Sequence, residues 1–321
     1  MTDDIVIGSP RTEVPRHGGN GNPLILLPEY APDPDLAAIL RKPYGERKAA
    51  EHRAVKGKYA YYSRASSAGK AIESTKALES YFKRMVAIGI ATREDLRLSV
   101  AAHAVDPDGN KSILNDIADQ ALDAAKASAK ANTGTALHKV TEYDDDGIVV
   151  PGIGETATRD LEAYQACKAR YGVEMHRAEQ FVVCDELAVA GTFDRAMSVA
   201  MVPDTRYVGD VKTGNTAKDR NGNIERDELG RPVLAYVTSI AVQLAVYAHS
   251  ELYDPATGAR SPLGVHQGAA IVIHLPQGLG SCELYWLNIA AGWEAAHVAK
   301  WAREWQGRRD LATPFTPAVA S

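Results

Sequence analysis

The pattern of apolar and polar positions predicts helices early in the chain and a strand-rich region later. Apolar residues recur near helical spacing over residues 73–88, whereas short runs rich in β-branched and aromatic residues begin at residue 179. Apolar runs of about four to eight residues, bounded by turn residues, are typical of strands. Strands are therefore expected near residues 179–183, 189–199, 206–212, 265–275 and 283–289.

Segments with a helical pattern flank these strands. We expect an Ala-rich helix from about residue 112, broken at residues 132–134, and further helices over residues 155–171, 232–250 and 292–307. The order is then helix, three strands, helix and strand. This order predicts an α/β protein in which helices flank a mixed sheet.

Turn signals and composition divide the chain into parts. Residues 8–23 are rich in Gly, Pro, Asn and charge, and residues 106–110 form a strong turn signal. We therefore expect a mobile N-terminal tail, a mainly helical extension, the α/β core and a C-terminal tail. Their expected bounds are 1–30, 31–110, 111–310 and 311–321.

The overall composition excludes several classes of protein. With 45% hydrophobic and 24% charged residues the chain is globular, and a net charge of −5 means that any contact with nucleic acid needs a local basic patch. No apolar run approaches the length of a membrane-spanning helix, and the acidic N-terminus lacks the apolar core of a signal peptide. We therefore expect a cytoplasmic protein that does not bind a membrane. Three scattered cysteines fit a reducing compartment.

The strand expected over residues 206–212 carries the most informative chemistry. Asp210 and Lys212 are two positions apart, so an extended strand points both side chains to one face. Asp194 lies on the preceding strand. Two carboxylates on neighbouring strands can share a hard divalent cation, and a lysine beside them can hold or activate water. The alternatives are a solvated Asp210–Lys212 ion pair and an Asp194–Arg195 pair.

Five short motifs occur in a fixed order across this part of the chain. They are Gly-xxx-His at 134–138, Glu179, Gly-xx-Asp at 191–194, Asp-x-Lys at 210–212 and Gln-xxx-Tyr at 243–247. The series spans roughly residues 111–305 and resembles the RecB-like nucleases of the PD-(D/E)XK superfamily, including CRISPR-associated RecB-like and phage exonucleases. The resemblance implies a restriction-endonuclease-like sheet and a divalent-metal-dependent deoxyribonuclease.

A metal site follows from these residues and from the resemblance. Asp194 and Asp210 would hold Mg²⁺ or Mn²⁺, and the backbone carbonyl of Val211 suits a third oxygen ligand. The resemblance makes His138 a further ligand, one that favours softer cations such as Mn²⁺. Lys212 would hold the attacking water or neutralise charge on the phosphate. The alternative for His138 is an ordinary histidine on the helix surface or in the core, with no metal bound.

Three further residues of the site are implied by the resemblance. Glu179 would lie near the metal in a structural or water-positioning role. Gln243 and Tyr247 share one helical face and would contact the scissile nucleotide or the metal-bound acid. Without that role they are polar groups that pack the helix onto the sheet. Glu142 lies on the His138 face, either to hold that ring or as a solvated charge.

The cysteines exclude one cofactor that many relatives carry. An iron–sulfur cluster takes four ligands, normally Cys thiolates. This chain has three cysteines, of which only Cys282 lies late in the sequence. No iron–sulfur cluster is therefore expected.

Residues 41–70 form a local basic patch. They contain nine Lys and Arg against two acids, with aromatic residues between them. Such a pattern suits a single nucleic-acid strand, whose phosphates are neutralised and whose bases stack. The alternative is a solvated basic face. The candidate DNA-binding residues are Arg47, Lys48, Arg53, Lys56, Tyr61, Tyr62 and Arg64.

The function expected from the resemblance is exonucleolytic processing of DNA ends in replication, repair or recombination, with a phage as one setting. The substrate would be single-stranded DNA or duplex ends, and a recombination or replication protein is a further expected partner. Residues 213–234, polar and Gly-rich, form either a flap over substrate or a variable loop. Two other functions stay open: a site-specific endonuclease of the same fold, and a non-catalytic DNA-binding or assembly module.

Overall fold

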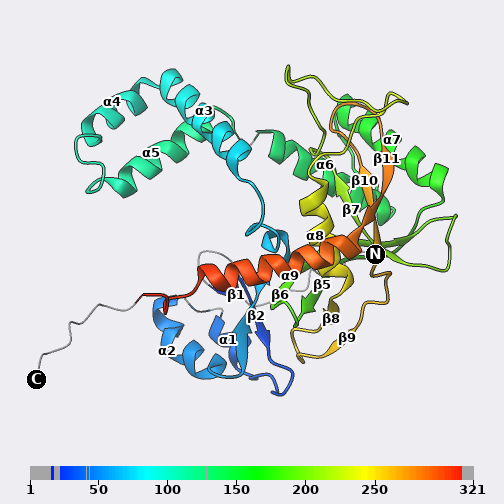
Figure 1. Cartoon of the computed structure of the whole chain (residues 1–321), viewed down its shortest axis with the longest axis horizontal. Helices are drawn as coiled ribbons and strands as arrows, with labels where there is room; N and C mark the ends of the chain where they lie inside the picture. Colours follow the sequence, from blue (N-terminus) through cyan, green and yellow to red (C-terminus); the bar gives the residue numbers. More distant parts are fainter. Residues whose placement is uncertain (1–15, 18–21, 41, 43, 128, 313–321) are drawn as a thin grey trace, which may run out of the picture.

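The computed structural model describes residues 16–17, 22–40, 42, 44–127 and 129–312, and it is a mixed α/β protein (Figure 1). Its main sheet has eight strands in the order β11-β10-β7-β6-β5-β8-β9, with β4 paired to β6 beside this path. None of the described helices has the length and apolar character needed to cross a membrane.

The centre of the main sheet is a meander followed by one parallel strand. Strands β5, β6 and β7 pair antiparallel in sequence, β10 pairs parallel to β7, and β11 returns antiparallel to β10. The predicted order of helix, three strands, helix and strand is observed, with the short β8 and β9 added before the last strand. The strands are β5 (Glu174–Cys184), β6 (Val189–Ser198), β7 (Tyr207–Lys212), β8 (Glu251–Tyr253), β9 (Arg260–Pro262), β10 (Ala269–His274) and β11 (Glu283–Asn288).

Helices cover both faces of this sheet. Along β10, Val272 packs in the core cluster that includes α8, whereas its neighbours Ile271 and Ile273 pack in a second cluster with α7. Both faces are therefore buried, which explains the continuous apolar run of this strand. The flanking helices are α6 (Ala129–Asp145), α7 (Glu155–Tyr171), α8 (Val237–Ala248) and α9 (Ile289–Gln306).

The N-terminal part is more closely joined to the core than its sequence indicates. The buried strand β2 lies inside the expected tail of residues 1–30, so that prediction is wrong for this strand; the rest of it falls mostly outside the described residues. The extension also contains β3 and β4, and β4 pairs parallel with β6. Its elements are β1 (Arg16–His17), β2 (Asn22–Leu26), α1 (Leu36–Leu40), α2 (Tyr44–Val55), β3 (Tyr59–Tyr61), β4 (Ser63–Arg64) and the 3₁₀ turn η1 (Ala65–Ser67).

Three helices form an arm that stands away from the sheet (Figure 1). They are α3 (Lys76–Thr92), α4 (Glu94–His103) and α5 (Lys111–Ala124), which share a small core of Leu96, Ile117 and Ala121. A Cβ on Gly89 would lie 1.9 Å from the Ala121 carbonyl oxygen, so glycine permits the close contact of α3 and α5. The domain boundary expected after residue 110 would separate α5 from α3 and α4, so that prediction is wrong. The helix break predicted at residues 132–134 is found earlier in the chain, between α5 and α6.

A buried arginine ties α6 and α7 to the sheet. Arg195 Nε donates to Asp145 Oδ2 at 2.6 Å, and Arg195 Nη2 donates to Thr141 Oγ1 at 2.9 Å. The Tyr164 hydroxyl of α7 donates to Asp145 Oδ1 at 2.7 Å, and Lys168 pairs with the same carboxylate at 2.7 Å. The Asp194–Arg195 pair considered from the sequence is therefore replaced by an Arg195–Asp145 pair.

The segment after β7, residues 213–234, is fixed at its base to the sheet. Thr216 Oγ1 lies 3.2 Å from His274 Nε2 at the end of β10, and the Tyr285 hydroxyl of β11 donates to the Pro232 carbonyl at 3.0 Å. His274 is itself buried and pairs in register with Lys212. We call residues 213–234 the flap.

Asp145→Ala should strongly destabilise the fold, because it leaves the Arg195 guanidinium buried without its carboxylate. Removing one partner of a buried ion pair typically lowers the free energy of unfolding by about 3–5 kcal/mol. Asp146→Ala, at the exposed neighbouring position, is the matched control. Urea unfolding followed by circular dichroism compares the two, and equal midpoints would show that the Arg195–Asp145 pair does not hold the helices.

Acid should weaken the fold partly through His274. Burial lowers the pKa of His274 from 6.5 to about 4. The unfolded chain then binds this proton more readily, so its contribution to stability is complete above pH 6.5 and falls as the pH drops towards 4. Between about pH 7.5 and about pH 5 this site should cost about 2 kcal/mol.

His274→Gln should reduce that loss, measured as urea midpoints at the two pH values. His103→Gln, in the arm, is the control for replacing a histidine elsewhere in the chain. If His274→Gln loses as much stability on acidification as the wild type, the ring is not the group that titrates.

Candidate metal centre

Three elements bring a histidine and two carboxylates together. His138 of α6, Asp194 of β6 and Asp210 of β7 each offer one ligand atom, and these atoms lie within 4.8 Å of one another. His138 Nε2 is 2.8 Å from Asp194 Oδ2. A histidine nitrogen with two carboxylate oxygens is a donor set that Mg²⁺ or Mn²⁺ can use. The structure therefore contains a group that could bind a metal ion.

The register of the sheet places the two carboxylates. Arg195 of β6 pairs with Gly209 of β7, so Asp194 and Asp210, one position further on each strand, lie opposite each other. On the face that Gly209 shares with Met197, a Cβ would lie 2.0 Å from the Met197 Cε. Glycine at this position leaves room for the methionine under the sheet.

Lys212 lies on the same face of β7 as Asp210, as its spacing predicts. Its Nζ forms an ion pair with Asp210 Oδ2. Asp210 is 4% exposed, and its Oδ2 has no hydrogen-bond partner among the described residues. Apart from the Lys212 ammonium this buried oxygen is unpartnered within the described part of the chain, and a carboxylate oxygen has more than one lone pair, so the residues fit a divalent cation.

Glu142 holds the His138 ring in place, one turn along α6. His138 Nδ1 is 2.9 Å from Glu142 Oε1, and the other carboxylate oxygen of Glu142 pairs with Lys139. A carboxylate on one ring nitrogen fixes the tautomer and directs the other nitrogen towards a ligand site. Of the two sequence alternatives for Glu142, the structure shows the contact with His138.

The pKa values of the three groups are displaced in different directions. Burial raises the pKa of Asp210 well above its usual value, and the charge of Asp194 adds to this. Burial acts in the same direction on Asp194, but hydrogen bonds with Asp210 and His138 outweigh it and lower its pKa. Burial opposes protonation of His138, yet its bonds to Asp194 and Glu142 raise the pKa to about 9. The pocket thus favours positive charge between the carboxylates, which is what a divalent cation supplies.

Glu179 lies beside this group in an unusual backbone conformation. Ala178 and Gln180 of β5 pair with Arg195 and Phe193 of β6, so Glu179 lies opposite Asp194. Its φ of 51° is rare for a residue other than glycine, and its side chain lines the cleft next to His138. The sequence identified this residue but gave no signal of its left-handed backbone.

Tyr247 and Gln243 pack from α8 against the back of the centre. Gln243 Nε2 donates to the Tyr247 hydroxyl at 3.4 Å, and Tyr247 is buried. A Cβ on Gly191 would come within 3.4 Å of that hydroxyl, so glycine in β6 admits the ring. Burial raises the pKa of Tyr247, and the charges of Asp194 and Asp210 add to this. The contacts fit a packing role as well as one at the nucleotide.

Val211 contributes its side chain to the core. It is buried among Leu137 of α6 and Ile273 of β10, which seats α6 on the sheet. A role for its backbone carbonyl as a metal ligand stays a prediction.

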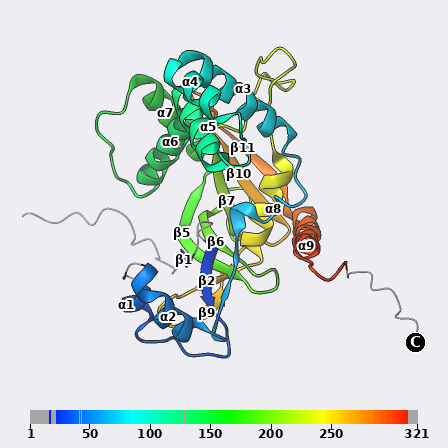
Figure 2. The same ribbon diagram turned by 90° about the vertical axis from the view of Figure 1, so that its left-hand side faces the viewer.

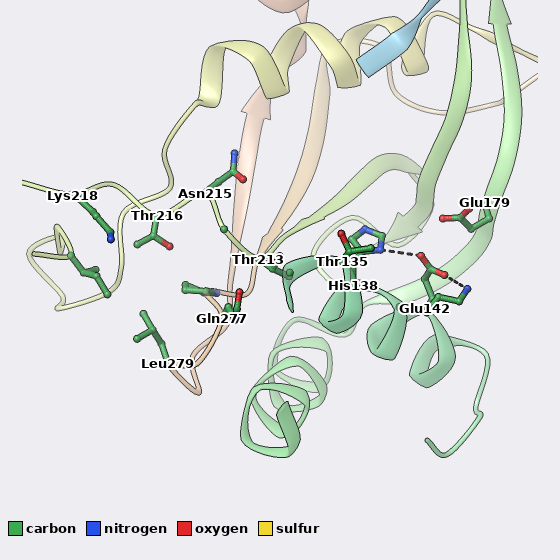
Figure 3. A pocket seen from close by; sticks show the side chains of 15 residues that line it. Thr135, His138, Glu142, Glu179, Thr213, Asn215, Thr216, Lys218, Gln277 and Leu279 are labelled. Carbon is green, nitrogen blue, oxygen red and sulfur yellow. Dashed lines mark hydrogen bonds and ion pairs between the residues drawn. The ribbon is translucent and has the colours of Figure 1, made fainter. Parts of the chain in front are cut away.

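His138, Glu142 and Glu179 line a cleft of about 930 Å³ beside the candidate centre (Figure 3). One wall is α6, where a Cβ on Gly134 would lie 2.8 Å from Thr213 Oγ1, so glycine lets the helix approach the sheet. The other walls come from the flap and from residues 276–279, which include Gln277 and Leu279. Sequence reasoning anticipated the flap as one alternative but missed residues 276–279, because only the parallel pairing of β10 with β7 places them here.

The basic patch lies apart from the metal centre. In both views α1 and α2 lie at the end of the molecule away from α6 (Figures 1 and 2). Lys48, Arg53, Lys56 and Arg64 are exposed, and Tyr61 is 48% exposed, so these side chains can meet a ligand. The Arg47 side chain lies outside the described residues.

One candidate of the patch is corrected. Tyr62 is buried beneath it, and its hydroxyl donates to Asp185 Oδ1 at 2.7 Å. The ring packs with Ile25 and Phe181, so it is a core residue and cannot stack on a base.

Comparison with known proteins assigns no family to this chain. No protein-family model matches the sequence, and no curated protein matches it. Function must therefore follow from the residues that meet at the cleft, since a fold class alone does not specify an activity.

Proposed function

We propose that the protein is a divalent-metal-dependent DNA nuclease of the RecB-like type, an exonuclease that hydrolyses phosphodiester bonds at DNA ends. One observation carries the proposal: the ligand atoms of His138, Asp194 and Asp210 lie within 4.8 Å of one another, and His138 also lines a cleft. Lys212 pairs with Asp210 in the same place. A metal site beside a lysine and an open cleft suits hydrolysis of a phosphodiester, in which a metal can polarise the phosphate and activate water.

The residues of the centre divide the work between them. Asp194, Asp210 and His138 would hold Mg²⁺ or Mn²⁺, with the Val211 carbonyl as a further expected ligand. Bound there, the metal would polarise the phosphate and lower the pKa of a water. The Lys212 ammonium, held by Asp210, is placed to donate hydrogen bonds to that water or to neutralise charge that develops on the phosphate.

The order of elements supports the same proposal at the level of the fold. Helix α7, strands β5 to β7, helix α8 and strand β10 follow the order of a restriction-endonuclease-like core. Asp194 lies on the second of these strands and Asp210 with Lys212 on the third. Because fold resemblance is a weaker argument than the chemistry of a site, this order adds to the proposal without carrying it.

The setting we propose is cytoplasmic processing of DNA ends in replication, repair or recombination, beside partner proteins of those pathways. A site-specific endonuclease of the same fold is a second candidate, and a non-catalytic DNA-binding module a third. The intact group of His138, Asp194 and Asp210 favours the two nuclease functions over the non-catalytic module. Cleavage of end-labelled linear DNA but not of circular DNA, with Mg²⁺ or Mn²⁺, would separate exonuclease from endonuclease.

Asp194→Asn and Asp210→Asn should each abolish cleavage and weaken metal binding, because each removes a charged ligand. The assay is degradation of end-labelled linear DNA, with metal affinity measured in parallel by calorimetry. Asp204→Asn, at an exposed site between β6 and β7, is the control and should behave as wild type. Near-wild-type cleavage by either variant would remove that carboxylate from the mechanism, and inactivity of the wild type in both metals would reject the nuclease proposal.

His138→Ala should change which metal supports activity, with the larger loss in Mn²⁺, since the imidazole is the softest ligand of the group. Rates in Mg²⁺ and in Mn²⁺ are compared for the wild type, this variant and His103→Ala, which removes a histidine from the arm. A metal profile for His138→Ala equal to that of His103→Ala would return His138 to a purely structural role.

A further inference from the structure

The flap is an ordered wall and not a loose connection. Asp219 Oδ1 accepts hydrogen bonds from the backbone nitrogens of Asn221 and Asn223 at 2.8 Å each, which closes the first turn of the flap. Asp227 closes the second turn in the same way, accepting from Leu229 at 3.0 Å and from Arg231 at 2.9 Å. A segment with both turns closed and its base fixed to β10 and β11 holds its side chains in defined places.

The flap faces α6 across the cleft. Thr216, Lys218 and Ile224 line it from the flap, while His138 lines it from the helix (Figure 3). Lys218 and Ile224 flank the first turn and pair with each other in an antiparallel β-bridge. The cleft therefore has a metal end at His138 and a flap end at Lys218.

The charges of the two ends differ. The carboxylates of Glu142 and Glu179 line the cleft beside the metal centre, and Lys139 at that end is paired with Glu142. At the flap end Lys218 is an exposed cation, with the apolar side chains of Ile224 and Leu279 in the same wall. An ammonium beside an apolar surface suits a phosphate attached to a sugar and a base.

The size of the cleft limits what can enter it. A volume of about 930 Å³ is within the range of sites for small ligands, about 300–1,000 Å³. A B-form duplex, whose major groove alone is about 12 Å wide, is far larger than such a site. The walls on three sides leave room for a few nucleotides of one strand.

We propose that the cleft takes a single DNA strand and that Lys218 binds a backbone phosphate at the flap end, away from the phosphate to be cut. This inference rests on the proposed nuclease function and adds the strandedness of the substrate and a binding residue that the sequence did not identify. Lys218 acts on the bound strand as a whole, in the ground state and the transition state alike. It therefore affects the KM for DNA more than kcat.

The chain offers a matched control inside the flap. Arg220 is exposed at the tip of the first turn, two positions from Lys218, and does not line the cleft. Lys218→Ala and Arg220→Ala thus remove the same charge from the same element. A general electrostatic effect of the flap would weaken binding equally in both variants, whereas a phosphate contact in the cleft would affect Lys218→Ala alone.

The first experiment measures binding without turnover. Fluorescence anisotropy of a labelled single-stranded oligonucleotide is recorded across a salt series in Ca²⁺, for the wild type and both variants, and a blunt duplex of equal length is compared. We expect Lys218→Ala to bind more weakly and to lower the log–log salt slope by about 0.7, the loss of one single-strand phosphate contact. Arg220→Ala should keep the wild-type slope, and the duplex should bind less tightly than the single strand.

Equal behaviour of Lys218→Ala and Arg220→Ala overturns the role of Lys218, and duplex binding as tight as single-strand binding overturns the strandedness. A second measurement, cleavage of the single strand in Mg²⁺, should show a higher KM with nearly unchanged kcat for Lys218→Ala. Failure of the nuclease proposal is distinct: the wild type would then bind the oligonucleotide in Ca²⁺ with the predicted dependence on Lys218 but cut nothing in Mg²⁺ or Mn²⁺.

Discussion

The candidate metal centre depends on the buried ion pair between Arg195 and Asp145. His138 reaches the sheet only if α6 lies at one depth and one rotation, and the Arg195 guanidinium fixes both by holding Asp145 and Thr141 of that helix. Because successive side chains of a strand point to opposite faces, β6 directs Asp194 to the group with His138 and Asp210, and the neighbouring Arg195 to its partners in α6. One dipeptide thus supplies a candidate metal ligand and the anchor for the helix that carries another candidate ligand.

Short-range geometry made much of the centre predictable from sequence. The period of two in a strand places Lys212 beside Asp210, and the glycines at 134 and 191 mark close approaches that the structure contains. The strand-rich region and the order of its elements also follow from apolar runs. Whether a metal binds and what the site cuts remain proposals, since they depend on chemistry that spacing alone does not determine.

Long-range packing accounts for what sequence could not predict. Tyr62 looks like a base-stacking residue within a basic segment, but its ring is buried against Ile25 and Phe181, which lie far from it in the chain. The helix break expected at residues 132–134 is absent because tertiary contacts of α6 outweigh the weak helix propensity of those residues. The packing of α5 against α3 likewise depends on the close contact of Gly89 with Ala121. This contact joins residues far apart in the sequence, so the local pattern of apolar residues does not predict it.

The pairing of β4 with β6 has a consequence for how the chain reaches its native state. Ser63 and Arg64 pair with Val189 and Ala190, and the whole helical arm lies between these partners in the sequence. The arm has mostly local contacts and can form early, whereas the β4–β6 contact must close a very long loop. During synthesis on the ribosome, β4 must therefore wait for β6 to emerge, with its edge exposed to other chains in the meantime.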